Sequence, residues 1–186
     1  MKKINEILAI LLLCIILTPS TVFAKNNDEI SKMNDIKNQL EKYLGTQETG
    51  EPFFLREKAI QDGISEEYLK IGDEVFKIMN AYYSYDKGIS TFDAMPIYGR
   101  WCGPEYGEGN GTPIDLLDTG CKEHDMCYKN VGYHKCSCDV RLVSYIDRNI
   151  GKMSGTEKRM ATVIRTWASI KSSKVTNSGG NTSCRV

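Results

Sequence analysis

Apolar residues recur at helical spacing over most of this chain. Between residues 28 and 44 they fall at every third or fourth position before Gly45 interrupts the run, and Ser65 can cap a second helix over residues 66–83. A third stripe, within residues 156–171, consists of Met160, Val163, Ile164, Trp167 and Ile170. Because the alternating pattern of strands is weak throughout, the sequence predicts an all-α fold.

The middle of the chain begins with a glycine-rich loop. The stretch "YGRWCGPEYGEGNGTP", residues 98–113, holds five glycines and two prolines, so its backbone can turn sharply and present its own amide and carbonyl groups. Thr112 and Pro113 have the residue types of a helix start, and Gly132 those of a helix end. We therefore expect a helix between them, and a further helix from "CSCDVRLVSYIDRNI", residues 136–150.

The first 24 residues, "MKKINEILAILLLCIILTPSTVFA", have the pattern of a secretory signal peptide. Two lysines precede a short apolar run, and Val22-Phe23-Ala24 suits signal peptidase. A retained membrane anchor is the alternative, which we disfavour because the run is short and no stop-transfer charges follow it. We expect residues 1–24 to be removed and the protein to be secreted to the extracellular space.

Removal of the signal peptide would leave six of the seven cysteines. They are Cys102, Cys121, Cys127, Cys136, Cys138 and Cys184. An even number in an exported chain favours disulfides over a zinc site, although six cysteines allow 15 pairings.

Charge and motif content divide the exported chain into two regions. Residues 25–96 carry 9 basic and 14 acidic side chains, whereas residues 97–186 carry 13 basic and 9 acidic ones. We expect a helical N-terminal extension over residues 25–94, which is a packing subdomain, a propeptide or a partner surface, and a catalytic domain over residues 95–186. Packing is the favoured role of the extension, because it holds no residue cluster that suggests chemistry.

The segment "CKEHDMCY", residues 121–128, holds the candidate chemistry. If a disulfide joined Cys127 to Cys138, Asp139 could approach His124, which lies about one helical turn before Cys127. A carboxylate on one imidazole nitrogen fixes the tautomer and leaves the other nitrogen as a base. No G-x-S-x-G motif is present and no cysteine is left free, so the expected nucleophile is water.

Asp125, beside His124, indicates a cation. An unpaired carboxylate is costly to hold in a closed site, and calcium takes carboxylate and carbonyl oxygens as ligands. The glycine-rich loop can supply the carbonyls. The residues therefore predict a calcium-dependent ester hydrolase that uses water and a His–Asp dyad.

The same segments resemble a known family. "YGRWCGPEYGEGNGTPIDLLDTGCKEHDMCY" followed by "CSCD" resembles the secreted phospholipases A2, with a YGxxCG calcium loop, a CxxHDxCY helix and a CxCD on the next helix. The loop is most similar to that of the plant secreted enzymes. The resemblance covers roughly residues 95–150 and implies a disulfide-linked core of antiparallel helices.

The resemblance also implies a role for each residue of the motif. His124 is similar to the general base, Asp139 to its carboxylate partner, and Tyr128 to a tyrosine whose hydroxyl supports Asp139. Asp125 matches the calcium carboxylate. Gly103 would give a carbonyl to calcium and its N–H to the oxyanion.

Two positions depart from the pattern of the family. Trp101 and Gly103 would give carbonyls to calcium, but Glu105 occupies the second glycine position of the usual C-G-x-G, so we expect Tyr106 to supply the third carbonyl. Gly120 replaces a cysteine, so one disulfide of the family is missing. The motif implies two disulfides, and elimination a third: Cys102–Cys121, Cys127–Cys138 and Cys136–Cys184.

The implied activity is hydrolysis of the sn-2 ester of glycerophospholipids at a bilayer or micelle surface. We expect a monomer with no nucleic-acid partner; protein partners are not indicated. The alternative is a catalytically silent, disulfide-linked binding protein or toxin that keeps the fold, and the altered loop is the argument for it.

Several side chains could meet lipid. Trp101 and Trp167 have the indole that favours a membrane interface, although Trp167 lies on the apolar stripe where core packing is expected. Lys158, Arg159 and Arg165 either face an anionic bilayer or are simply solvated.

Overall fold

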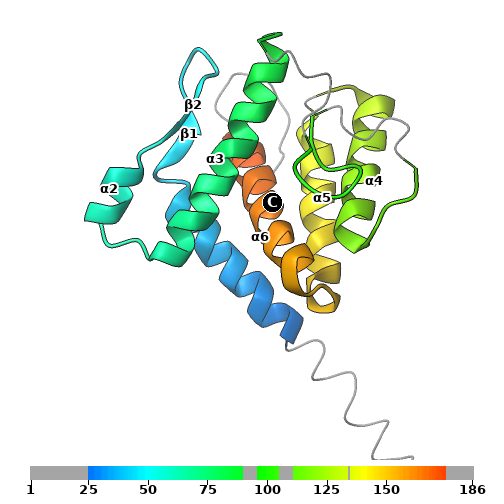
Figure 1. Ribbon diagram of the computed structural model, residues 1–186, viewed down its shortest axis with the longest axis horizontal. Helices are drawn as coiled ribbons and strands as arrows, with labels where there is room; N and C mark the ends of the chain where they lie inside the picture. Colours follow the sequence, from blue (N-terminus) through cyan, green and yellow to red (C-terminus); the bar gives the residue numbers. More distant parts are fainter. Residues whose placement is uncertain (1–24, 90–95, 105–110, 134, 175–186) are drawn as a thin grey trace, which may run out of the picture.

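The computed structural model describes residues 25–89, 96–104, 111–133 and 135–174. The predicted signal peptide, Glu105, Tyr106 and Cys184 lie outside the described residues. Residues 25–40 are helical and are followed by these elements: β1 (Leu44–Thr46), β2 (Pro52–Phe54), α2 (Arg56–Gln61), α3 (Glu66–Asp86), α4 (Leu116–Val131), α5 (Cys136–Asn149), η1 (Ile150–Lys152) and α6 (Gly155–Lys174) (Figure 1). The prediction of a mostly helical fold is confirmed.

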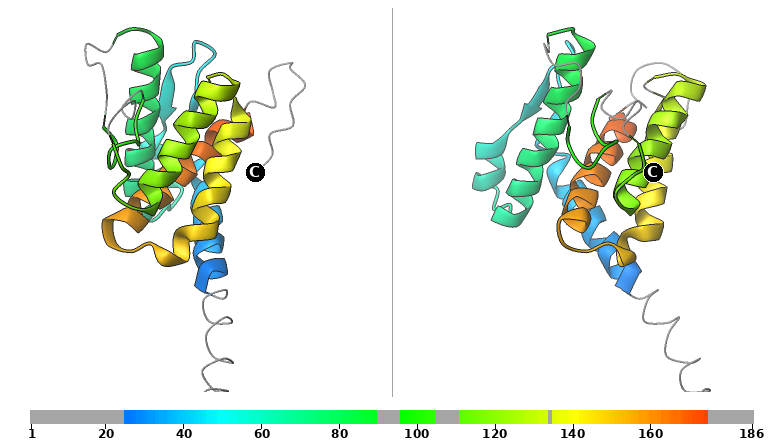
Figure 2. Two further views of the ribbon diagram at one scale, coloured as in Figure 1. Left: turned by 90° about the vertical axis from the view of Figure 1, so that its right-hand side faces the viewer. Right: turned by 45° about the vertical axis from the view of Figure 1, so that its right-hand side comes forward.

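Helix α6 occupies the middle of the molecule. It packs against α5 and α3, and α5 packs in turn against α4, so that α3 and the α4–α5 pair lie on opposite sides of α6 (Figures 1 and 2). The five apolar residues predicted to form one face of the last helix are all buried. Trp167 is among them, so its predicted core packing is confirmed.

The N-terminal helix ends earlier than its apolar pattern predicts. Residues 25–40 are helical, and Leu44, expected to be the last helical residue, begins a two-stranded antiparallel sheet in which it faces Phe54. The strands are three residues long, too short to produce a visible alternating pattern. The turn between them includes Gly50, whose φ of 85° few other residues adopt.

Helix α3 begins where the sequence predicts. The Ser65 side chain accepts a hydrogen bond from the Tyr68 N–H, as an N-cap residue does. Gly72, which weakens the helix pattern, is needed for packing, because a Cβ there would lie 2.7 Å from Cζ of Phe54. A glycine at this position thus lets the β-hairpin lie close against α3 (Figure 1).

The N-terminal region shares one hydrophobic core with the rest of the described chain. Met33, Ile36 and Leu40 belong to the same buried cluster as Leu117 and Trp167. Polar contacts also connect the two regions: Asn26 donates to the Asp147 carbonyl and accepts from the Gly151 N–H, and Arg165 donates to Asn34. The boundary between residues 94 and 95 stays a prediction.

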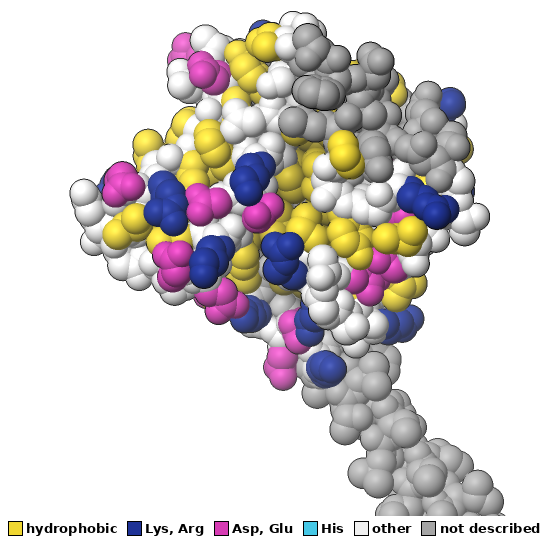
Figure 3. Space-filling model, viewed as in Figure 1, with side chains coloured by type: hydrophobic (Ala, Val, Ile, Leu, Met, Phe, Trp, Pro, Cys, Tyr) yellow, Lys and Arg dark blue, Asp and Glu magenta, His cyan; other side chains and the backbone are white. Residues whose placement is uncertain are grey.

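Two basic residues of α6, Lys158 and Arg165, have partners within the protein. Arg165 is buried and forms a two-point ion pair with Asp147, so it does not face a bilayer. Lys158 pairs with Glu29. On the face shown in Figure 3, basic and acidic side chains are interspersed over the part formed by α2 and α3 rather than separated. Among the described residues, none of the helices combines the length and apolar character that a membrane span requires.

Candidate active site

Helix α4, which carries His124 and Asp125, begins three residues later than predicted. Its N-cap is Asp115, whose carboxylate accepts from the Asp118 N–H at 2.9 Å, so the expected start at Thr112 and Pro113 is wrong. A carboxylate at this position satisfies an N–H at the helix start and faces the positive end of the dipole. Glu157 of α6 adds a second carboxylate, which accepts from the N–H groups of Leu116 and Leu117. Gly132 ends the helix as predicted.

Asp118 holds the glycine-rich loop against α4. This fully buried carboxylate accepts backbone N–H groups at 2.8–2.9 Å from Arg100, Trp101 and Ile114. Gly99, with a φ of 60°, permits the approach, because a Cβ there would lie 2.3 Å from a carboxylate oxygen of Asp118. Asp118 was not predicted to have a role, although it lies in the segment that carries the resemblance. Its position in the first turn of α4 explains how the loop is fixed beside His124.

The described cysteines confirm two predicted pairings. Cys102 is bonded to Cys121, and thereby joins the loop to α4. Cys127 is bonded to Cys138 with a Cα–Cα distance of 5.7 Å, and thereby joins α4 to α5. Cys136 is disulfide-bonded as well, but its predicted partner lies outside the described residues.

His124 and Asp139 form a buried hydrogen-bonded pair. His124 Nε2 lies 2.9 Å from Asp139 Oδ1, and the exposed fractions of the two residues are 4% and 0%. The Tyr128 hydroxyl, one turn after His124, donates to the same oxygen at 2.6 Å. The arrangement leaves His124 Nδ1 facing away from Asp139, 3.8 Å from the nearer Asp125 oxygen. The three residues predicted to form the dyad and its support therefore lie together.

Burial and charge act against each other on this pair. Burial lowers the pKa of His124, but the hydrogen bonds and charges of Asp125 and Asp139 outweigh it and hold that pKa above its usual value. For Asp139, burial raises the pKa, yet the contributions of His124, Lys171 and Tyr128 hold it below its usual value. Burial and the charge of Asp139 raise the pKa of Tyr128 well above its usual range, so this hydroxyl remains a donor.

Lys171 is a member of the site that sequence reasoning missed. Its Nζ donates to the Tyr128 hydroxyl at 2.6 Å and lies 3.6 Å from Asp139 Oδ2. Burial lowers the pKa of Lys171, and the charge of Asp139 partly opposes this. In sequence, Lys171 is one of several basic residues in the last helix. Nothing in its neighbours along the chain could have revealed its approach to Asp139.

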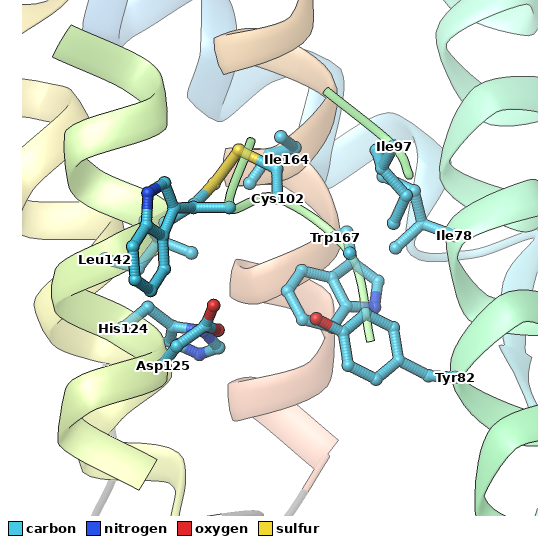
Figure 4. A pocket seen from close by; sticks show the side chains of 12 residues that line it. Ile78, Tyr82, Ile97, Cys102, His124, Asp125, Leu142, Ile164 and Trp167 are labelled. Atoms are coloured by element: carbon cyan, nitrogen blue, oxygen red, sulfur yellow. A yellow bond between two sulfur atoms is a disulfide. The ribbon is translucent and has the colours of Figure 1, made fainter. Parts of the chain in front are cut away.

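A small pocket lies in front of His124. Among the residues that line it are His124 and Asp125 from α4, Trp101 and Gly103 from the loop, and Tyr82 from α3. Figure 4 shows His124 and Asp125 on one side, with Tyr82 and Trp167 opposite them. The wall opposite Asp125 is largely apolar and includes Ile78, Ile97, Ile164 and Trp167. Tyr82 and Trp167 stack with their ring centroids 4.7 Å apart.

The donors at this pocket fit calcium better than zinc. Asp125 supplies a carboxylate whose side chain is 27% exposed, and the backbone of Trp101 and Gly103 lines the same pocket. These are hard oxygen ligands, the kind that calcium takes. Within the described ranges, no group of three or more His, Cys, Asp and Glu side chains could hold a metal. Any cation here therefore depends on the loop carbonyls as well as on Asp125.

Two comparisons with known proteins agree with the resemblance. Residues 76–166 match the family model described as "Phospholipase A2". The chain is 43% identical over 60 residues to "Phospholipase A2 SSD387" of Scolopendra dehaani, which covers 32% of this chain and 38% of that protein. It is 43% identical over 58 residues to "Basic phospholipase A2 nigroxin A" of Micrurus nigrocinctus, covering 31% and 46%.

A third relative gives the same result: "Basic phospholipase A2 beta-bungarotoxin A-AL3 chain" of Bungarus multicinctus is 49% identical over 49 residues, covering 26% of this chain and 33% of that protein. The aligned part thus spans less than half the length of each of these relatives. No solved structure matches the chain. The family match begins at residue 76, within α3, so it includes part of the predicted extension.

Proposed function

We propose that the phospholipase A2 domain at residues 76–166 makes this protein a calcium-dependent phospholipase A2, which hydrolyses the sn-2 ester of glycerophospholipids to a fatty acid and a lysophospholipid. The observation that carries the proposal is the buried His124–Asp139 pair, with a nitrogen to oxygen distance of 2.9 Å, beside a carboxylate and a loop backbone that line one pocket. We further propose that it is an exported monomer that acts at a bilayer or micelle surface.

His124 acts as the general base. Its Nε2–H donates to Asp139, so Nδ1 carries the lone pair and accepts a proton from water as the water oxygen attacks the sn-2 carbonyl carbon. The carbonyl oxygen becomes an oxyanion. When the tetrahedral intermediate collapses, the bond to the glycerol oxygen breaks, and His124 returns its proton to that leaving oxygen. Asp139 stabilises the imidazolium that exists between these two proton transfers.

The loop and Asp125 act on the oxyanion side. Asp125 and the carbonyls of Trp101, Gly103 and Tyr106 would hold calcium, and the Gly103 N–H would donate to the oxyanion. Calcium, when bound, supplies Lewis acidity at the ester carbonyl. The hydrogen bonds from the N–H groups of Arg100 and Trp101 to Asp118 support this role, because they fix the loop backbone immediately before the Trp101 carbonyl.

The apolar wall suits an acyl chain. Ile78, Ile97 and Trp167 line the pocket opposite the carboxylate of Asp125. Methylene groups placed against these side chains would leave water, while the polar ester would lie toward His124 and Asp125. Since Ile78 belongs to α3, the predicted extension contributes to the pocket rather than only covering it.

The test is release of an sn-2-labelled fatty acid from anionic and zwitterionic vesicles, with calcium and with chelator, by wild type and by His124→Gln. We expect release that requires both calcium and His124. Calcium binding is measured in parallel by titration calorimetry. Release that persists in chelator would exclude the role of the metal. A protein that neither releases fatty acid nor binds calcium would instead be the silent binding protein.

A further inference from the structure

We propose that Lys171 is a positioning residue of the dyad, whose ammonium group fixes Tyr128 and Asp139 so that the carboxylate meets His124 in one orientation. The expected effect on turnover rests on the proposed function, whereas the expected effect on the His124–Asp139 hydrogen bond does not. It adds a residue from the last helix, outside the family match at residues 76–166, to the predicted site.

Hydrogen bonds connect Lys171 to the imidazole. The ammonium donates to the Tyr128 hydroxyl at 2.6 Å, this hydroxyl donates to Asp139 Oδ1 at 2.6 Å, and the same oxygen lies 2.9 Å from His124 Nε2. The ammonium polarises the Tyr128 hydroxyl and thereby strengthens its bond to Asp139. Because this hydroxyl and the His124 N–H share one acceptor oxygen, the position of that oxygen depends on both donors. A change at Lys171 should therefore be felt at His124, although the two side chains belong to different helices.

Lys171 also compensates the second oxygen of Asp139. Oδ2 is buried and has no hydrogen-bond partner within the described part of the chain, but Nζ of Lys171 lies 3.6 Å from it. A buried carboxylate without a nearby cation is strongly disfavoured. The ammonium therefore favours the ionised form of Asp139, which is the form that orients His124.

Three aromatic rings hold the ammonium in place. Its nitrogen lies 5.6 Å from the ring centroid of Tyr82, and 5.1 Å from those of Tyr128 and Trp167. Cations at such distances over aromatic rings are attracted to the face of the ring. A solvated lysine would extend into water, whereas this side chain lies between α3, α4 and α6 and is 25% exposed. The rings restrict where the donor can point.

The chain provides a matched control on the same helix. Lys158 of α6 has a side-chain exposure of 26%, close to that of Lys171, and pairs with a carboxylate, Glu29, that belongs to residues 25–40. Lys158→Met thus removes a half-buried, ion-paired lysine without touching Tyr128 or Asp139. Lys171→Arg keeps the charge and donors at the test position.

The experiment compares wild type, Lys171→Met, Lys171→Arg and Lys158→Met by kinetics and by NMR. In Lys171→Met we expect kcat to fall about 10- to 100-fold, the size of the loss of a hydrogen bond to a charged group, at unchanged KM and calcium Kd. Lys171→Arg should recover most of that loss, and Lys158→Met should match wild type. The NMR readout is the downfield proton on His124 Nε2, assigned by its disappearance in His124→Gln.

We expect this proton to move upfield in Lys171→Met and to stay in place in Lys158→Met, because its shift reports the hydrogen bond to Asp139. A fall in kcat with an unmoved resonance would overturn the positioning role, as would an unchanged kcat and resonance. If Lys171→Met does not fold, Lys171→Gln, which keeps an N–H donor but loses the charge, is judged by the same criteria. If wild type releases no fatty acid, the proposed function fails, and the resonance alone decides the role of Lys171.

Discussion

The two halves of the candidate site are built in different ways. On the dyad side, His124, Asp139 and Tyr128 are buried and joined by side-chain hydrogen bonds, and the Cys127–Cys138 disulfide joins their helices. On the loop side, Asp125 is partly exposed, and the other donors are backbone groups held indirectly through Asp118. One half is held together by side-chain hydrogen bonds within the protein, whereas the other, under the proposed function, would complete its contacts with calcium.

This difference implies a division of labour. Separating the buried groups of the dyad would leave polar atoms without partners, which costs free energy. The geometry of the dyad should therefore persist with or without metal. The loop side has fewer side-chain contacts, so its order should depend more on calcium. A substitution can therefore disable one half of the site while the properties of the other half can still be measured.

The largest effect is expected from His124→Gln, which breaks the dyad alone. Loss of the general base should lower kcat by about 100- to 10,000-fold, because glutamine cannot accept the proton of water. Calcium affinity, measured by titration calorimetry, should stay close to wild type since Asp125 and the loop are unchanged. Near wild-type turnover by this variant would show that the dyad mechanism is wrong.

The next largest effect is expected from Asp125→Lys, which breaks the other half. A cation in place of the carboxylate should abolish calcium binding and lower kcat by roughly 100- to 1,000-fold, the usual loss when stabilisation of the oxyanion is removed. The downfield proton of His124 should remain, because its partner is Asp139. Calorimetry and NMR on one sample give both readouts; retained calcium binding would place the cation elsewhere.

Asp118→Ala should have a smaller, structural effect on the loop side. Three backbone N–H groups would lose their acceptor, so we expect the free energy of unfolding to fall by about 3 kcal/mol, with weaker calcium binding. Asp73→Ala is the control, because the Arg56–Asp73 pair is partly exposed and should contribute about 1 kcal/mol or less. Urea unfolding with and without calcium measures both. Equal losses in the two variants would contradict the role given to Asp118.

The two halves also differ in how far the sequence could predict them. The dyad was predictable because His124 and Tyr128 share a helix face one turn apart, and the motif places Asp139 beside a cysteine that bonds to α4. The start of α4 was not predictable from the sequence. Asp115 and Thr112 are both suitable N-cap residues, and only the folded loop decides between them. The β-hairpin was missed because its strands are three residues long.

The role of Lys171 could not be predicted from the sequence, for a different reason. The apolar stripe of the last helix predicts which face enters the core, and this was confirmed, but not which polar group at the edge of that face meets a carboxylate on α5. Such a contact depends on the angle between α5 and α6. Tertiary packing therefore adds Lys171 to the dyad side, which is the half of the site that the motif already described best.

The smallest expected effect is a dependence of the stability of the dyad side on pH. The pKa of Asp139 is lower in the folded protein than in the unfolded chain, because His124, Lys171 and Tyr128 outweigh the effect of burial. A carboxylate with a lowered pKa stabilises the fold above its unfolded pKa, near pH 4, and this contribution is lost as the pH falls through the folded value.

Unfolding of wild type and Asp139→Asn is therefore measured by urea between about pH 3 and pH 6. The stability advantage of wild type should shrink as the pH falls through the lowered pKa of Asp139. Asp125→Asn, which changes a partly exposed carboxylate on the loop side, is the control over the same range. An advantage of wild type that is constant across this range would mean that Asp139 is no more stabilised as a carboxylate in the fold than in the unfolded chain, and the dyad side would then owe its order to the disulfide rather than to charge.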